Sequence, residues 1–437
     1  MAASLGPILL LLALVLLWLR VPLALALLAI SVPGLLLMPA GGALPSAIAS
    51  LFSSLDGLLH SPGLLLVPLV VLLGNLALYA GISTRIYDAS AVWLRSLPGG
   101  PALAAVLGCG GFAAISGSST ACASTMGRIC VPEMLRLGYD PKLAAASVAA
   151  GGTLGSLIPP SILFVLFGIL TDRPIAPLFM AGILPGLLSL AGMIAVVAWW
   201  VRSDPGAAPD VPRTTATPLD ATFAAWPAIL IFAVIVFGIF SRALTVAQAV
   251  AISVALTLAI GVAQTRLTWG AVWRACRESL IESVSILLVL AGAWLFADFA
   301  TQSGMAEAFS MSVAQLDPSY LMLMLAIALI YLIMGMFLDP LAILVLTLPF
   351  LARLVADYDL NPVWLGVVIV KLLEIGLITP PVGLNVYIIA GVTRDMGIDR
   401  IFAGIGRFLA VDLLVLTILI LFPAVSLLIP TAMGAVP

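Results

Sequence analysis

Two short segments of this chain combine a glycine, a proline pair and a hydroxyl residue within apolar sequence. They are Gly155–Pro160 in the first half and Gly376–Pro381 in the second. A proline pair removes backbone donors from a helix, and the carbonyls that it frees need water, protein or a cation as a partner inside a membrane. The segments therefore predict two broken helices with carbonyl oxygens available to a hard cation. A proline kink rescued by neighbouring helices is the weaker interpretation, because a glycine stands four residues before the prolines both times.

Hydroxyl groups gather at one further point in the first half. The run consists of Ser116, Gly117, Ser118, Ser119 and Thr120. Hydroxyls and exposed carbonyls are the hard oxygen ligands that a sodium ion needs, so the run is interpreted as the tip of a helical hairpin with an ion site. Small residues also permit close helix packing in membranes. The internal repeat described below favours the ion site over packing alone.

The composition indicates that these segments lie in a membrane rather than in water. Hydrophobic residues make up 63% of the chain and charged residues 9%, whereas soluble domains carry roughly a quarter charged residues. Val21–Met38, Gly63–Ala80 and Leu178–Val201 are long enough to span a bilayer. They are continuously apolar rather than alternating, which indicates helices and not strands. The chain is therefore predicted to be an all-α polytopic membrane protein.

The sequence gives little support to a metal site, to nucleic-acid binding or to enzymatic catalysis. The four cysteines lack a paired metal-ligand spacing, and the single histidine, His60, lies in a loop sequence. A net charge of −2 gives no reason to expect nucleic acid. A membrane-embedded enzyme would need clustered acidic, histidine or cysteine residues within the membrane, and apart from Asp339 and Glu374 there is little sign of them. We therefore expect no enzyme and no cofactor, apart from sodium ions as coupling ions.

The landmarks of the first half recur in the second at a fixed spacing. Pro141 with Pro362, and Ser118 with Asp339, stand 221 residues apart, as the two proline pairs do. Semi-polar segments at 44–60 and 266–281 each precede a new span and are predicted as interfacial helices. The first predicted repeat covers 1–201, with a hairpin at about 98–137 and a broken helix at 141–170. A cytoplasmic linker is predicted at 202–220. The second repeat covers 221–437, with a hairpin at about 317–356 and a broken helix at 362–389.

The distribution of basic residues predicts how the repeats are oriented. Lys and Arg collect in cytoplasmic loops. With the amino terminus outside and both hairpins re-entrant, 13 of the 18 Lys and Arg residues fall inside, and only Arg173, Arg242 and Arg353 fall outside. The two hairpins then enter from opposite sides, so the repeats are inverted. Inverted repeats with broken helices are the architecture of secondary transporters, which bind their substrates near the midplane.

The predicted binding site joins both hairpin tips and both breaks. Its candidate residues are Ser116, Gly117, Ser118, Ser119, Thr120, Gly152, Thr153, Pro159, Pro160, Gly335, Asp339, Gly376, Thr379, Pro380, Pro381, Gly383 and Asn385, with sodium expected at Ser118, Ser119, Asp339 and Thr379. Asp339 is either a sodium ligand or the cap of a helix that begins at Pro340, and the two roles are compatible. Lys371 and Glu374, three residues apart, are interpreted as a structural pair.

Several of these runs resemble one known family, the tripartite ATP-independent periplasmic (TRAP) transporters, and specifically their large membrane subunit. The similar segments are Gly111–Thr120, Gly138–Pro141, Ala149–Ser161 and Leu373–Asn385. The resemblance implies an elevator-type carrier in the bacterial inner membrane, coupled to sodium, that receives a small organic acid from a periplasmic binding protein. It also implies a separate small four-helix membrane subunit. Thr245–Ala249 departs from a Thr-Pro-Thr-Glu-Ala segment common in the family, outside the predicted transport core.

A stand-alone sodium/anion symporter of similar elevator fold is the main alternative, since it shares hairpin tips and broken helices. The Gly138–Pro141 and Ile378–Asn385 runs favour the tripartite family. A channel accounts for two inverted hairpins less well than alternating access does. No residue distinguishes a dicarboxylate from another organic anion.

Overall fold

The protein is entirely helical wherever its computed structural model describes it. The described residues are 11–13, 15–16, 19, 21–37, 44–61, 63–209, 217–393 and 396–435, and no strand occurs among them. The predicted all-α class is therefore confirmed. Most of the first apolar run and residues 210–216 of the predicted linker lie outside the described residues.

The helices of the first half follow one another with short connections. They are α2 (Leu23–Leu37), α3 (Leu44–Leu59), α4 (Leu66–Tyr79), α5 (Ile82–Leu94), α6 (Gly100–Ser116), α7 (Ser119–Arg136), α8 (Pro141–Leu157), α9 (Ile162–Leu170) and α10 (Ile175–Ser203). A 3-10 turn, η1 (Pro205–Ala207), follows α10.

The helices of the second half follow in the same way along the chain. They are α11 (Pro218–Ala224), α12 (Trp226–Phe240), α13 (Val246–Ala263), α14 (Trp269–Gln302), α15 (Met305–Gln315), α16 (Tyr320–Gly335), α17 (Pro340–Asp357), α18 (Pro362–Gly376), α19 (Leu384–Val392), α20 (Ile398–Leu421) and α21 (Ala424–Ala432).

Length and composition make this a multi-span membrane protein. In the described part of the chain, six helical stretches are long and apolar enough to cross a bilayer, or up to eight if two bent pairs each count as one span. The pairs α4–α5 and α11–α12 bend by 64° and 61°. Gly81, at a positive φ of 71°, lies at the first bend, and Pro227, which has no backbone donor, begins the helix after the second.

Two pairs of helices turn back on themselves as hairpins, and two further pairs are separated by a short break. α6 and α7 turn back at Gly117 and Ser118, and α16 and α17 turn between Gly335 and Pro340. α8 and α9 are separated by four residues around Pro159–Pro160, and α18 and α19 by seven residues around Pro380–Pro381. Both proline pairs have a cis peptide bond.

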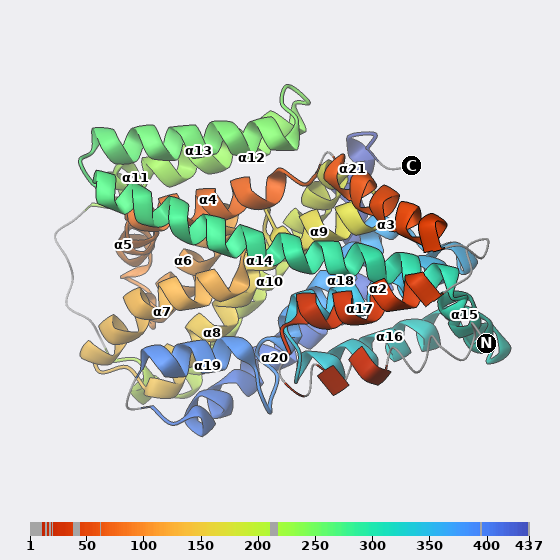
Figure 1. The fold of residues 1–437 in the computed structure, drawn as a ribbon. Helices are drawn as coiled ribbons and strands as arrows, with labels where there is room; N and C mark the ends of the chain where they lie inside the picture. The colour runs from red at the N-terminus through yellow and green to blue at the C-terminus, as the bar shows by residue number, and fades with distance from the viewer. Residues whose placement is uncertain are drawn as a thin grey trace.

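The longest helix departs from the predicted arrangement. Segment 266–281 is not a separate interfacial helix, because α14 runs unbroken for 34 residues from Trp269. No glycine or proline interrupts the chain between residues 271 and 291, whereas α3 ends just before Pro62 and Gly63. Figure 1 shows α14 crossing the molecule, and α2, α3, α4, α15 and α17 all contact it.

The most buried part of the protein surrounds α8. α8 packs against α6, α7, α10, α18, α19 and α20, and almost all of the stretch from Pro141 to Leu170 is buried. Small residues make this density possible: a Cβ on Gly152 would lie 2.8 Å from the Cβ of Ala123. The first hairpin is therefore held tightly against the first broken helix.

Charged residues are buried at one place in this core. Lys371 Nζ lies 2.6 Å from Asp412 Oδ1 and 3.0 Å from Ser189 Oγ, while Glu374 Oε2 is 4.0 Å away. All three charged side chains are fully buried. The pair that the spacing suggested is thus secondary to a closer one with Asp412, on α20. The cluster joins α18, α20 and α10.

Removing the lysine alone should destabilise the protein. Lys371→Met leaves two buried carboxylates without their counter-charge, and we expect a loss of roughly 3–5 kcal/mol in the free energy of unfolding. The double variant Lys371→Met/Asp412→Leu should recover part of that loss, because the closest pair is removed as a unit while Glu374 stays buried without its counter-charge. Thermal unfolding of the purified protein measures both. A double variant no more stable than the single one would contradict this account.

Candidate functional site

Both hairpin tips and both breaks meet at one cavity of about 290 Å³, here called the central cavity. Its lining comes from five places in the chain: Gly117–Thr120 at the first tip, Ser156, Ile162 and Leu163 beside the first break, Asp339–Leu341 at the second tip, Leu377 and Leu384 beside the second break, and Glu282, Ser285 and Ile286 on α14. Residues more than 220 positions apart thus surround one space.

The first tip is fastened to the first break through the backbone. Gly117 has a positive φ of 64°, and its carbonyl accepts a hydrogen bond from Ile162 N at 3.1 Å. A Cβ at Gly117 would lie 2.6 Å from the carbonyl oxygen of Pro160. Only glycine suits this position, both for its backbone conformation and for the approach.

The hydroxyls of the first tip have distinct surroundings. Ser118 caps α7 by accepting from Ala121 N at 3.4 Å, and its Oγ lies 3.2 Å from that of Thr120. Ser119 is buried, and its hydroxyl bonds the carbonyl of Thr153 and the hydroxyl of Ser156. Ser119 therefore fastens the tip to α8 while it borders the cavity.

The second tip repeats the cap with a carboxylate. Asp339 Oδ1 accepts hydrogen bonds from Leu341 N at 2.9 Å and Ala342 N at 3.1 Å, so Asp339 caps α17. Neither bond uses Oδ2, and the residue lines the central cavity. The cap role leaves the predicted role as a sodium ligand open. Ser118 and Asp339, related by the 221-residue spacing, both serve as N-caps.

Many of the other predicted residues shape the breaks from behind the cavity wall. The lining does not include Gly152, Thr153, Pro159, Pro160, Gly335, Gly376, Thr379, Pro380, Pro381, Gly383 or Asn385, and Ser116 lines a neighbouring recess instead. Gly335 and Gly376 bring two backbones together, since a Cβ on either would lie within 2.8 Å of the other's Cα. Asn385 donates from its side chain to the carbonyl of Ala149 at 3.2 Å, which links the two broken helices.

The sequence interpretation missed the contribution of α14. Glu282 and Ser285 line the central cavity, yet they lie just beyond the segment interpreted as an interfacial helix. The signal was present, because an acidic residue within a continuous apolar helix indicates a polar cavity or partner. The cavity lining carries two carboxylates, Glu282 and Asp339, and no lysine or arginine among the described residues. No group of three metal-binding side chains is found in the described part either.

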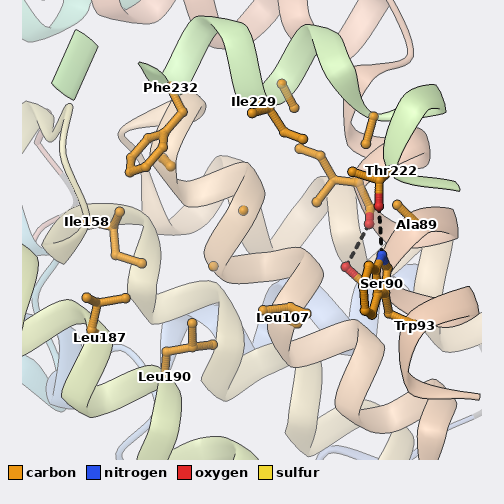
Figure 2. Close-up of a pocket in the computed structure, with 16 residues that line it drawn as sticks. Ala89, Ser90, Trp93, Leu107, Ile158, Leu187, Leu190, Thr222, Ile229 and Phe232 are labelled. Carbon is orange, nitrogen blue, oxygen red and sulfur yellow. Dashed lines mark hydrogen bonds between the residues drawn. The ribbon is translucent and has the colours of Figure 1, made fainter. Parts of the chain in front are cut away.

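A larger cavity, of about 380 Å³, lies elsewhere and has a different character. Figure 2 shows its wall of Leu, Ile and Phe side chains, with Trp93 Nε1 donating to Thr222 Oγ1 at 2.8 Å at one end. No charged side chain lines it among the described residues. The central cavity is lined by two carboxylates and several hydroxyl residues, which makes that cavity the candidate site.

Comparison with known proteins shows the family of the chain. The model of the tripartite ATP-independent periplasmic transporter family, DctM component, matches residues 10–425. The chain belongs to this family. The C4-dicarboxylate TRAP transporter large permease protein DctM of Pseudomonas aeruginosa is 32% identical over 399 residues, which cover 89% of this chain and 91% of that protein.

Two further likenesses concern chain organisation and fold. The isethionate TRAP transporter permease protein DctMQ of Oleidesulfovibrio alaskensis is 30% identical over 391 residues, 89% of this DctM-family chain but only 61% of that protein. The crystal structure of the Alcanivorax borkumensis YdaH transporter superposes with a TM-score of 0.61 at 16% identity, over 97% of this chain and 99% of that chain. The second likeness shows a shared fold.

The contact between tip and break can be tested at Gly117. Gly117→Ala should cost more stability than Gly81→Ala, because both residues have a positive φ but only Gly117 has a backbone neighbour within 4 Å of a new Cβ. The shared backbone strain is about 1–2 kcal/mol, and the clash with Pro160 adds to it at Gly117. Thermal unfolding of the two purified variants measures the difference. Equal losses of stability in the two variants would show that the first tip can shift away from Pro160 without cost.

Proposed function

We propose that this DctM-family chain carries a small organic acid into the bacterial cell across the inner membrane, driven by a sodium gradient. The observation that supports it most is the central cavity, where two hairpin tips and two helix breaks bring hydroxyl, carbonyl and carboxylate oxygens together. Broken helices that meet at one site are typical of secondary transporters. A site where broken helices meet binds its substrate between elements that can move.

Sodium explains how an acidic cavity accepts an anion. The described lining offers Glu282 and Asp339 and no basic side chain, so an organic anion alone would meet only negative charge. Sodium ions at Ser118, Ser119, Asp339 and Thr379 would reverse that balance, and oxygen ligands suit such an ion. Cation and anion then bind together, which is the requirement for coupling.

The proposed movement is of the elevator type within an inverted repeat. The first tip is bonded to the first break, and the second hairpin touches α18 through Gly335 and Gly376. These parts form the moving unit, and α14 with α4 forms the frame on the other side of the cavity. Carrying the cavity past the frame opens it to each side in turn.

The proposed partners are a small four-helix membrane subunit and a periplasmic substrate-binding protein. The relative named DctMQ is longer than the matched region, which supports a second membrane part beside this one. The names of the relatives mention C4-dicarboxylates and isethionate, so the cargo is sought among small organic acids. The binding protein delivers that acid to the periplasmic face.

The function is tested by uptake into proteoliposomes that hold this chain and its small subunit. Radiolabelled C4-dicarboxylates and isethionate are offered with the binding protein outside. We expect uptake with an inward sodium gradient and none with a proton gradient alone, because the cavity carries many oxygen ligands and few titratable groups. Uptake that proceeds equally without sodium would refute the coupling. Full uptake without binding protein would favour a stand-alone symporter.

Asp339→Asn separates the roles of ion ligand and helix cap. Asparagine caps a helix about as well as aspartate, so the variant should fold normally while the cavity loses a charge. We expect the sodium concentration for half-maximal uptake to rise about tenfold, equivalent to about 1.4 kcal/mol. Ser118→Ala should produce a smaller rise, because a hydroxyl is a weaker ligand than a carboxylate. An unchanged value in Asp339→Asn would leave the residue a cap only.

A further inference from the structure

A small recess opens beside the central cavity, behind the first hairpin tip. It has a volume of about 20 Å³ and lies between α4, the first hairpin, α9 and α14. Its polar lining residues are Asn75, Ser116, Ser118, Thr125 and Glu282. A cavity needs about 10–15 Å³ to hold one water-sized particle. The recess therefore has room for one small ligand.

One buried hydroxyl in the recess has no hydrogen-bond partner. Ser116 is only 3% exposed, and its Oγ bonds no other group among the described residues. The neighbouring backbone explains why the residue is fixed there, since a Cβ on Gly74 of α4 would lie 3.2 Å from the carbonyl oxygen of Ser116. Buried polar atoms are nearly always satisfied in folded proteins. The Ser116 hydroxyl thus indicates a ligand in the recess.

A carboxylate completes this environment from the opposite wall. Glu282 lines both the recess and the central cavity, and no lysine or arginine lines either of them in the described part of the chain. Glu278, one turn earlier on α14, is already paired, because Tyr79 donates to its Oε1 at 2.8 Å. Asn75 donates to Ser279 of α14 at 2.9 Å. Its side chain also hydrogen-bonds the Glu282 carboxylate and so holds it beside the recess. The frame therefore presents a carboxylate, with nearby oxygens, to the tip.

We propose that the recess binds one sodium ion through the Glu282 carboxylate and the Ser116 hydroxyl, with further oxygens from Asn75, Ser118 and Thr125. The chemistry is that of a monovalent cation, since a single carboxylate balances a single charge and the other donors are neutral oxygens. A carboxylate in a membrane protein requires such a partner or a polar cavity. This ion is additional to the sodium ions proposed at Ser118, Ser119, Asp339 and Thr379, and Ser118 lies between it and them.

The position of the recess gives the ion a role in transport. Its walls belong to α4 and α14 on one side and to the first hairpin on the other, so a bound ion joins the frame to the moving unit. This role rests on the proposed function. The ion holds the hairpin against the frame and must leave before the hairpin can move.

Direct binding of sodium tests the site without any substrate. The full-length chain, in nanodiscs with its small subunit, is titrated with radioactive ²²Na⁺ and bound sodium is counted per chain. Glu282→Gln should lower the affinity of one class of sites at least about tenfold, equivalent to about 1.4 kcal/mol. Ser116→Ala should weaken the same class by a smaller factor. Glu278→Gln is the matched control, with the same change one turn away on the same helix, and should bind sodium as the unchanged protein does.

The outcomes separate this proposal from the proposed function. Loss in Glu282→Gln with retention in Glu278→Gln supports the recess site, provided that both variants unfold at the same temperature without sodium. Unchanged binding in Glu282→Gln, or equal losses in both variants, overturns it. If Glu282→Gln binds sodium normally while uptake still requires a sodium gradient, the proposal of a sodium site in the recess is wrong. The proposed function of sodium-driven uptake is then still supported.

Discussion

Every backbone donor and acceptor must find a partner in an apolar solvent, and this chain interrupts two of its most buried helices. The structure around the breaks follows from that constraint. In the first break, Ser161 donates to the carbonyl of Ser156 and Ile162 N donates to the carbonyl of Gly117. In the second, Asn385 donates from its backbone to Leu377 and from its side chain to Ala149. The hairpin and the neighbouring broken helix therefore supply what each break lacks.

Two groups of charges in the membrane region show opposite solutions to the cost of burial. Lys371 and Asp412 lie 2.6 Å apart in the core, with Glu374 Oε2 4.0 Å from the same ammonium, so buried carboxylates there have a basic partner that joins three helices. Glu282 and Asp339 face the central cavity without a basic residue among its described lining. A charge left unbalanced beside a cavity is one that a ligand can balance. The same residue types thus serve structure in one place and binding in the other.

Local patterns made most of the fold predictable. Asp140 and Asn361, each followed by proline, cap α8 and α18, and the sequence shows both signals without reference to any distant contact. The bends at Gly81 and before Pro227 have local signals too, but many glycines and prolines do not bend a helix. The partners of Asp412 and the cavity beside Glu282 could not be identified in this way. Their roles depend on which helices pack together, and Lys371 meets Asp412 across 41 residues of sequence.

The kinds of contact around the central cavity support a division into a moving unit and a frame. The tips and breaks meet through backbone at glycine positions, with Gly335 against Gly376 and Gly155 against the carbonyl of Ser118. Such contacts leave little space between each hairpin and its broken helix, which suits the joint movement that we propose. α14 reaches the cavity with the side chains of Glu282, Ser285 and Ile286. Side chains can exchange partners at little cost, so in the proposed movement sliding is easiest at α14. The other frame helix, α4, approaches the first hairpin through backbone, since a Cβ on Gly74 would lie 3.2 Å from the carbonyl oxygen of Ser116.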